Sequence, residues 1–460
     1  MRRTMAAIAV SVFLALAPAG TGSCFAQYVN LDPEPTGIRS MSAGGQAISC
    51  GNDLADAWLQ PVCILGGPGF RATASGSVYY DISARDASFN ELRHRWTDRT
   101  QWFAPGCAGA AYRFGRGPWE PTVGLVIHRM IDARREELSE GYRHDLYWQA
   151  TTRLSVGIDA TTAAFAVRIC RTAAAGVAAS LVFDGAERDY RLVYTGGEWR
   201  GTDRHYGFRA WDLTLGGRVA IRKVTAGLSL SLPYTLTERE EYTEEVSDPV
   251  YHHTLWKTRD TTLPARIMSI PAMVGVGLNV GLTRWLSVAT TLSWKPYSVA
   301  EMHTTVGVTT TVGLVLRDTT FNCGWRDALL FGLGAECRPP RLGAPLRFGV
   351  RNIAGPYRNF DRPRSLVDSL SARGLAVSFG TSLGRPELTF DFGFEYARVE
   401  VEYLASHFPG QSVTDRLVDQ RFRLQVACTY QPGMSRQGTI ETDETIGQPE
   451  NISIKPLPDP

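Results

Sequence analysis

A strict alternation of apolar and polar residues is the feature that most limits the fold of this chain. In residues 388–396, LTFDFGFEY, every second residue is Leu, Phe or Tyr, and the residues between them are Thr, Asp, Gly and Glu. Side chains point alternately to opposite faces of a strand, so one face here is apolar and the other polar. This length suits a tilted transmembrane strand. The pattern recurs at 70–82, 224–236, 286–294, 346–351 and 422–430.

Two further patterns favour a closed barrel over a soluble β-sandwich, which also alternates. Connections between the alternating stretches are long and short in turn, and aromatic residues lie near the stretch ends, as in outer-membrane barrels. The aromatic residues are Tyr79, Tyr80, Trp102, Tyr234, Trp285, Trp294, Tyr396 and Tyr430. We expect long outer loops near 83–98, 132–155, 185–204, 238–262, 297–324, 352–371 and 404–415. Short turns are expected near 115–118, 170–174, 222–223, 283–284, 339–344 and 385–386.

These connections set the number of strands. Seven long and six short connections join 14 strands, and an even count places both chain ends on the periplasmic side. The sheet must close, because open edges would leave unpaired backbone groups in hydrocarbon. The sequence therefore predicts an all-β, 14-stranded antiparallel transmembrane β-barrel over residues 67–430. Residues 431–460 are polar and proline-bearing, which predicts a disordered periplasmic tail.

The N-terminus has the pattern of a secretory signal peptide over residues 1–26. Arg2 and Arg3 precede a short apolar run, and Cys24-Phe25-Ala26 gives a small-residue cleavage site. A lipoprotein signal with lipid on Cys24 is the alternative. No later segment has the roughly 18 uninterrupted apolar residues of a membrane helix, so we expect an exported chain that reaches the outer membrane.

Charge and cysteine content narrow the function further. The chain has 48 Lys and Arg against 46 Asp and Glu, which gives no case for nucleic acid. Export permits disulfides, and two cysteine pairs are close in sequence: Cys50 with Cys63, and Cys323 with Cys337. The alternative is that the cysteines are small buried hydrophobic residues. No Cys/His spacing indicates a metal, and no motif indicates a cofactor.

A compact, non-periodic segment precedes the alternating region. Ala43-Gly44-Gly45, then Asn52-Asp53, then Pro61 resemble the N-terminal hatch of the FadL-type outer-membrane transporters of long-chain fatty acids and other hydrophobic compounds. The resemblance continues in LPARIMSIPAMVGVGLNVGLTRWLSVATTLSWKPYS (263–298) and GLAVSFGTSLGRPELTFDFGFEY (374–396). The chain departs from the family at Gln60-Pro61-Val62, where the family has Asn-Pro-Ala.

The resemblance implies that residues 27–66 form a hatch that plugs the barrel. Its hatch or gating residues would be Gly44, Gly45, Asn52, Asp53 and Pro61. A barrel of 14 strands is too wide for wall side chains alone to fill, so a plug is physically reasonable. The resemblance also implies a lateral exit at a kink in the third strand, here 118–130, where Pro121 and Gly124 would weaken the ladder. An ordinary bulge at a strand start is the alternative.

Cationic side chains inside the barrel are candidates for holding a carboxylate head group. By alternation, five arginines face the lumen: Arg218, Arg347, Arg351, Arg421 and Arg423. Arginine suits bidentate carboxylate binding. The alternative is that they pair with lumenal acids such as Asp212, Asp391 and Glu395.

These observations predict a passive channel for long-chain fatty acids or other hydrophobic small molecules, monomeric and surrounded by outer-membrane lipid. No nucleophile elbow or groupable catalytic set is present, so we expect no enzyme activity. Three alternatives stay open: a structural or secretion-associated barrel without transport, a general porin, and an outer-membrane hydrolase. A role as surface antigen or adhesin would be compatible with transport.

Overall fold

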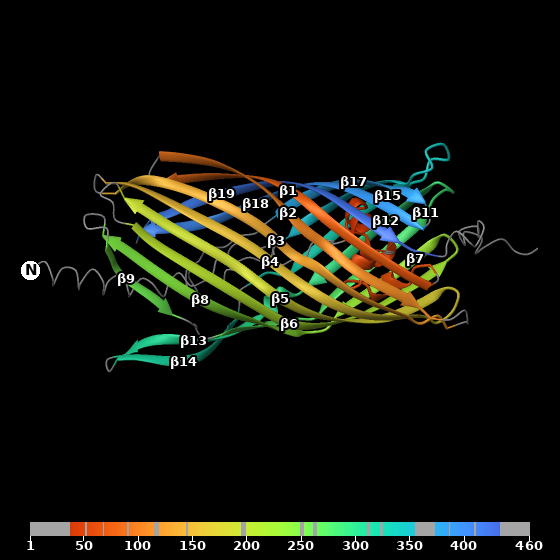
Figure 1. Ribbon diagram of the computed structural model, residues 1–460, viewed down its shortest axis with the longest axis horizontal. Helices are drawn as coiled ribbons and strands as arrows, with labels where there is room; N and C mark the ends of the chain where they lie inside the picture. Colours follow the sequence, from red (N-terminus) through yellow and green to blue (C-terminus); the bar gives the residue numbers. More distant parts are fainter. Residues whose placement is uncertain are drawn as a thin grey trace, which may run out of the picture.

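The computed structural model describes residues 37–50, 53–67, 69–89, 92–114, 119–143, 146–194, 199–248, 253–260, 265–310, 313–322, 325–354, 373–385, 387–408 and 411–432. The predicted signal peptide and nearly all of the predicted tail lie outside these residues. The described chain forms one closed, antiparallel barrel, in which β1 pairs with β19 (Figure 1). The 14-stranded all-β barrel predicted from the sequence is therefore confirmed.

Ten of the 14 wall strands are continuous, and four are divided into shorter segments. The continuous strands are β1 (Gly69–Phe89), β2 (Leu92–Arg113), β3 (Thr122–Arg143), β4 (Leu146–Arg168), β5 (Ala173–Tyr194), β6 (Trp199–Ile221), β16 (Leu346–Ala354), β17 (Arg373–Arg385), β18 (Leu388–Phe408) and β19 (Gln411–Tyr430). The divided strands are β7 (Val224–Ser231) with β8 (Tyr234–Asp248); β9 (His253–Asp260) with β10 (Arg266–Ile270) and β11 (Met273–Gly281); β12 (Leu286–Lys295) with β13 (Glu301–Thr310); and β14 (Gly313–Asn322) with β15 (Ala328–Cys337).

Prolines lie at three of these divisions. Pro233 separates β7 from β8, Pro271 separates β10 from β11, and Pro296 follows β12. Proline has no N–H to donate to a ladder, so a strand is readily interrupted there. After Pro296 the chain makes one 3₁₀ turn, η4 (Tyr297–Val299), before β13 begins.

The long connections expected from the sequence are largely strand. For example, β3 and β4 extend through the stretch 132–155 and leave only residues 144–145 between them. Strands of 21 to 23 residues are about twice the length needed to cross a bilayer. Polar residues follow one another without alternation in the sequence of their far halves, which therefore resembles that of loops. The part of the expected loop 352–371 from residue 355 onward lies outside the described residues.

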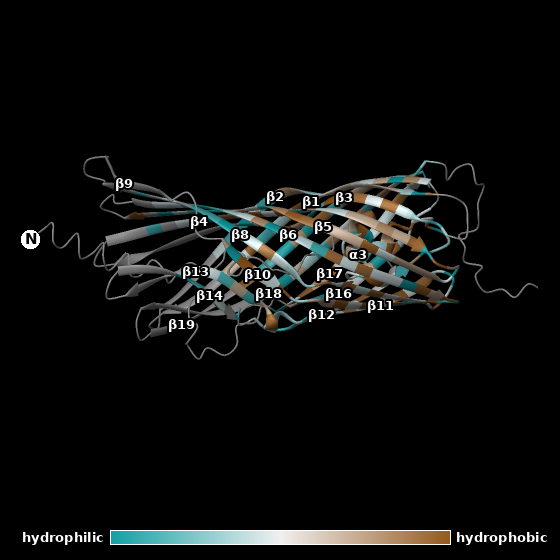
Figure 2. Ribbon diagram, turned by 90° about the horizontal axis from the view of Figure 1, so that it is seen from below, coloured by the Kyte–Doolittle hydropathy of each residue, from teal (hydrophilic) through white to brown (hydrophobic). Residues whose placement is uncertain are grey.

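The wall residues separate by face as the alternation predicted. In β18, Phe390, Phe392 and Phe394 are exposed on the outside, whereas Asp391 and Glu395 are buried inside. Exposed apolar side chains cover the half of the barrel nearest the short turns, which is largely brown in Figure 2. An outward apolar band of this kind is typical of a barrel embedded in lipid.

The aromatic residues divide between the two faces. Trp285, Trp294 and Tyr430 are exposed on the outer surface, as a girdle requires. Tyr79 and Trp102, in contrast, are buried and stack on each other with ring centroids 4.9 Å apart, so these two are not girdle residues.

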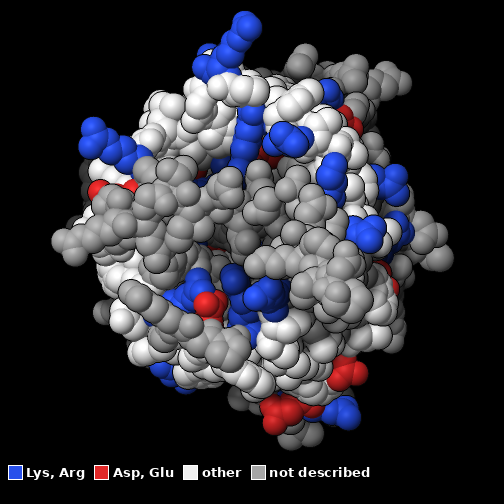
Figure 3. All heavy atoms as spheres, turned by 90° about the vertical axis from the view of Figure 1, so that its right-hand side faces the viewer, with Lys and Arg blue, Asp and Glu red and all other residues white. Residues whose placement is uncertain are grey.

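The short-turn end of the barrel is basic. Figure 3 looks at this end and shows Lys and Arg side chains around its rim. Exposed members in or beside the turns are Arg171, Arg222, Lys223, Arg284, Arg338, Arg341 and Arg385. No helix in the described ranges is long and apolar enough to cross a membrane.

In the described residues, four short helical turns precede the barrel strands. They are α3 (Ile38–Ser42), α4 (Ala47–Cys50), η2 (Leu54–Asp56) and η3 (Pro61–Ile64). They lie inside the barrel near the short-turn end (Figure 1). We call residues 37–67, apart from 51–52, the inner segment.

Candidate functional site

The inner segment packs against a belt of glycines in the barrel wall. These glycines lie on strands all around the lumen: Gly124, Gly176, Gly216, Gly227, Gly275, Gly277, Gly332, Gly334, Gly349, Gly380 and Gly393. At Gly349 an added Cβ would overlap the backbone of Ala43 and Gly44, so only glycine permits this approach. The inner segment therefore touches the wall at backbone level on several sides.

Polar contacts also fix the inner segment. The Arg39 guanidinium lies 3.1 Å from Asp391 of β18, and Thr291 of β12 donates to Gln46 Oε1 at 2.7 Å. The buried Gln60 amide donates to the carbonyl of Leu228 at 3.1 Å and to that of Gly217 at 3.3 Å. Gln60, where the sequence departs from the FadL pattern, thus anchors the segment to the wall.

The expected hatch residues have local roles in this segment. Gly44 and Gly45 adopt positive φ of 73° and 79°, which glycine tolerates best. Asp53 caps η2 by accepting from the Ala55 N–H at 3.2 Å. Pro61 opens η3 and lies against Gly176 and Gly216. Asn52 lies outside the described residues. The expectation that these residues act as a hatch remains a prediction about function.

A buried carboxyl sits within the inner segment. Asp56 accepts a hydrogen bond from the Gly37 N–H at 3.0 Å. Burial, reinforced by the neighbouring charge of Asp53, raises the pKa of Asp56 to about 7. Docking of the segment is therefore linked to protonation near neutral pH.

The lumenal arginines are placed inside, as alternation predicted, and most contact acids. Arg351 makes a bidentate pair with Glu395, with two N–O distances of 3.0 Å. Arg347 donates to Glu336 at 2.8 Å and lies 3.7 Å from Asp391.

The remaining three arginines are more varied. Arg421 is 3.8 Å from Asp81, and Arg423 donates to Ser77 at 3.3 Å. The guanidinium groups of both lie over the ring of Tyr79. Arg218 is half-buried on β6. The pairing of lumenal arginines with acids, left open by the sequence, is thus observed for Arg347, Arg351 and Arg421.

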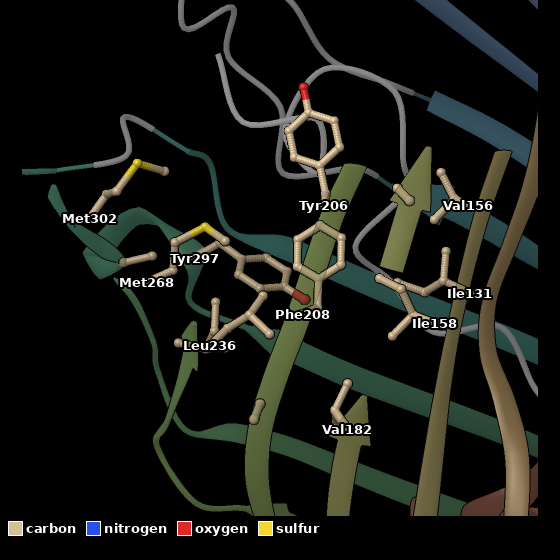
Figure 4. Close-up of a cluster of buried hydrophobic side chains, with 14 of the residues drawn as sticks. Ile131, Val156, Ile158, Val182, Tyr206, Phe208, Leu236, Met268, Tyr297 and Met302 are labelled. Carbon is tan, nitrogen blue, oxygen red and sulfur yellow. The ribbon is translucent and has the colours of Figure 1, made fainter. Parts of the chain in front are cut away.

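A cluster of apolar side chains lines the lumen beyond the inner segment. It gathers residues from β3, β4, β5, β6, β8, β10 and the region of η4 and β15. Its large members include Tyr206, Phe208, Met268, Tyr297 and Trp325, and Figure 4 shows several of them converging between the strands. The rings of Tyr297 and Trp325 meet edge to face at 5.9 Å. We call this the lumenal apolar cluster.

A buried ionic network adjoins this cluster on the same strands. Arg266 of β10 contacts both Glu238 and Glu240 of β8 at 2.9 Å, and Arg204 of β6 reaches Glu240 at 3.2 Å. Neither the network nor the aromatic members of the cluster was predicted. The inward position of the two acids could have been predicted, because alternation along β8 places Leu236, Glu238 and Glu240 on the same inward face.

The wall is weakly closed between β2 and β3. Their ladder has seven residue pairs, from Arg113–Thr122 to Cys107–His128, although both strands continue far beyond it. A bulge lies on each side of the place where pairing stops. Gly106 is the extra residue on β2 opposite β1, and Met130 is the extra residue on β3 opposite β4. We call the unpaired stretch the first seam.

A side-chain contact crosses the first seam where the backbone ladder has ended. The Trp102 indole of β2 donates to the Asp132 carboxylate of β3. Arg129 contacts Asp132 at 3.6 Å and Asp159 of β4 at 2.7 Å. The lumenal apolar cluster reaches this place, because it contains Ile131 and packs against Met130 and Ala133.

The residues expected to mark a kink lie nearer the short-turn end. Pro121 immediately precedes β3, and Gly124 pairs regularly with Ala111 on one side and Ala164 on the other. The irregular backbone of β3 is instead at Met130, six residues beyond Gly124. A methionine gives no sequence signal for a bulge, so this position could not be read from residue type.

Two of the four cysteines considered for disulfides have described side chains, and both are free thiols. Cys63 is free and buried, and its thiol contacts the Ala47 carbonyl at 3.6 Å. Cys337 is also free, at the end of β15. The Cys50 side chain and Cys323 lie outside the described residues. Within the described part of the chain, no group of His, Cys, Asp and Glu is arranged to hold a metal.

Comparison with known proteins rests on structure. No protein-family model matches the sequence, and no curated protein sequence matches it either. Among solved structures, the toluene transporter TodX of Pseudomonas putida matches with a TM-score of 0.56 at 12% identity, covering 88% of this chain and 99% of that one. A FadL homologue of Pseudomonas aeruginosa matches with a TM-score of 0.56 at 11% identity, covering 87% and 98%. The chain therefore has the FadL-type barrel fold.

Proposed function

We propose that this protein is an outer-membrane channel for the passive uptake of hydrophobic small molecules. The observation that carries the proposal is the lumenal apolar cluster, enclosed by a barrel whose outer surface is also apolar. An apolar molecule gains little from a water-filled pore, whereas aromatic and aliphatic side chains inside the wall can bind it. The FadL-type fold supports this reading, since the similar TodX is a toluene transporter by its name.

The inner segment acts as the hatch of this channel. Its contacts with the glycine belt and its anchors at Asp391 and Leu228 keep it against the wall. It would prevent leakage of polar solutes through a barrel of this width. The signal peptide, placement in the outer membrane and a monomeric state belong to the same proposal.

The first seam is the lateral exit. Molecules in the lumenal apolar cluster lie beside Ile131 and Met130 of β3, where no backbone ladder joins β3 to β2. Opening there requires the Trp102–Asp132 contact to separate, whereas opening on the other side of β3 would break its long ladder with β4, which runs from Thr122–Ala166 to Arg143–Leu146 with one bulge.

The charge pattern favours uncharged substrates over carboxylates. Glu395 already forms a bidentate pair with the Arg351 guanidinium, and Glu336 accepts a hydrogen bond from Nε of Arg347. A fatty acid must compete with these acids for a head-group site, which a neutral hydrocarbon need not do. Long-chain fatty acids remain within the proposed range, bound chiefly through the hydrocarbon tail.

A binding titration tests the proposal. The folded protein, in a detergent too bulky to enter the lumen, is titrated with toluene, a long-chain fatty acid and the matching alcohol, followed by tryptophan fluorescence. We expect saturable binding of apolar ligands, with acid and alcohol bound about equally. A strong preference for the acid would support a head-group site formed by the lumenal arginines. Absence of binding by a folded barrel would contradict the proposed channel function.

Paired variants locate the binding. Phe208 is 4% exposed in the lumenal apolar cluster, whereas Phe103 is 65% exposed on the outer face. Phe208→Ala should weaken binding about tenfold, equivalent to about 1.4 kcal/mol, and Phe103→Ala should leave it unchanged. Equal effects of both variants would place the ligand outside the lumen.

A further inference from the structure

A second wall ladder is as short as the one at the first seam. Strands β15 and β16 form six residue pairs, from Cys337–Leu346 to Gly332–Arg351. Both strands continue beyond this point. Residues Ala328–Phe331 of β15 stay paired only with β12, and Asn352–Ala354 of β16 stay paired only with β17. We call this unpaired stretch the second seam.

The second seam lies within the outward apolar band. Leu329 and Phe331 are exposed on the outer face of β15, and Phe348 is exposed on the outer face of β16. Asn352 follows on the same face as Phe348 by alternation. A polar side chain in such surroundings is costly, and therefore suggests a specific role.

The Asn352 side chain takes the place of a backbone partner. Its carboxamide oxygen accepts a hydrogen bond from the Phe331 N–H, and its Nδ2 donates to the Leu329 carbonyl at 2.9 Å. In an antiparallel ladder, the backbone of a residue likewise accepts one hydrogen bond from the adjacent strand and donates one to it. The amide thus satisfies two main-chain groups of β15 that would otherwise face hydrocarbon unpaired.

The lumenal apolar cluster extends from one seam to the other. It packs against Met130 and Ala133 of β3 at the first seam. It also contains Ala328 of β15 and packs against Ala354 of β16 at the second. Six wall strands separate the seams in one direction and eight in the other, so they lie on roughly opposite sides of the barrel.

We propose that the second seam is a further lateral opening, through which uncharged hydrocarbon-like molecules exchange between the lumenal apolar cluster and membrane lipid, and that Asn352 is the residue that closes it. Separation of β15 from β16 here requires only the two hydrogen bonds of one side chain to break. The opening adds a second route to the channel proposed above, but its existence can be tested without any transport measurement.

The test asks whether lipid chains reach the lumen beside the second seam. Trp325 is 2% exposed and belongs to the cluster near Ala328, whereas Phe208 belongs to the same cluster on β6, away from both seams, where it pairs with Glu238 of β8. Each is replaced in turn by the photoreactive p-benzoylphenylalanine. The folded proteins are placed in phospholipid nanodiscs and irradiated, and lipid adducts are counted by mass spectrometry. We expect at least fivefold more adduct at position 325 than at position 208.

Two engineered disulfides supply the control. The first combines Phe331→Cys with Asn352→Cys, two positions that would face each other if the ladder continued. This disulfide locks the second seam and should abolish the adduct at position 325. Leu333→Cys with Val350→Cys joins an outward pair within the existing ladder and should leave the adduct unchanged. Equal adducts at positions 325 and 208, or an adduct that persists with the seam locked, would overturn the second opening. Neither result depends on whether ligands bind, so this experiment tests the second opening independently of the proposed channel function.

Discussion

At the scale of single residues, the buried Asp56 couples the position of the inner segment to pH. Its pKa is raised to about 7 in the docked segment from an ordinary 3.8. Below about pH 4 the carboxyl is protonated whether or not the segment is docked. As pH rises from about 4 to 7, the undocked carboxyl ionises while the docked one stays protonated, so docking loses stability until both forms are ionised above about pH 7.

We therefore expect channel openings to become more frequent as the pH rises to about 7 and to level off above it. In planar bilayers, the open probability should rise several-fold between pH 5.5 and pH 8.5. Asp56→Asn keeps an oxygen that can accept from the Gly37 N–H but cannot ionise, so its open probability should not vary with pH in this range. A variant that retains the full pH response would assign the titration to another group.

Alternation predicted which side chains face the lumen, and Glu395 and Asp391 were among the acids considered as partners, but which arginine meets which acid was not predicted. Alternation along a strand fixes the face, which is why Arg347 and Arg351 were placed correctly. Glu336 lies on the adjacent strand β15, and Glu395 lies on β18, two strands away from β16, and the register between strands is not readable from one sequence. The same limit hid the contact of Trp102 with Asp132.

At the scale of elements, the glycine belt determines where the inner segment can sit. At Gly349 an added methyl group would overlap the backbone of Ala43 and Gly44, whereas at Gly207 of β6 an added methyl group meets no atom within 4 Å. Gly349→Ala should displace α3 at a cost of about 1–3 kcal/mol, typical of overpacking.

Single-channel recording can check this displacement. Gly349→Ala should show larger and more frequent conductance steps than the unchanged protein, and Gly207→Ala should match the unchanged protein. If both glycine variants conduct alike, contact with the belt does not hold the segment in place.

Strand ends could not be predicted because the apolar signal stops before the strands do. In the sequence of the far parts of β3 and β4, charged and polar residues follow one another without alternation, so the periodicity predicted a loop there. Hydrogen bonding between the two strands nevertheless continues as far as Arg143–Leu146. Similarly, the extra residues at Gly106 and Met130 follow from the geometry of three adjacent strands, which local sequence does not encode.

At the scale of the whole molecule, the wall closes without help from the inner segment. Strands β1 and β19 pair over 16 positions, from Ala72–Tyr430 to Ala87–Asp415. Removal of residues 37–64 should therefore leave a folded barrel with a permanently enlarged pore. The barrel should keep its β-sheet circular dichroism and admit small sugars in a liposome-swelling assay. Loss of sheet structure on this deletion would show that the segment is needed to build the wall.

The excess length of the strands has a kinetic consequence for biogenesis. On the proposed placement, the outer hairpins must pass through the bilayer once, tip first, before the wall is complete. The hairpin of β3 and β4 carries Arg134, Arg135, Glu136, Glu137 and Glu140 on its leading part, and each charge is costly to move through hydrocarbon. Spontaneous insertion into a pure phospholipid bilayer should consequently be slow and should quicken in thinner or defect-rich membranes. A chain of this shape depends on assistance at the membrane far more for the rate of its assembly than for the stability of its product.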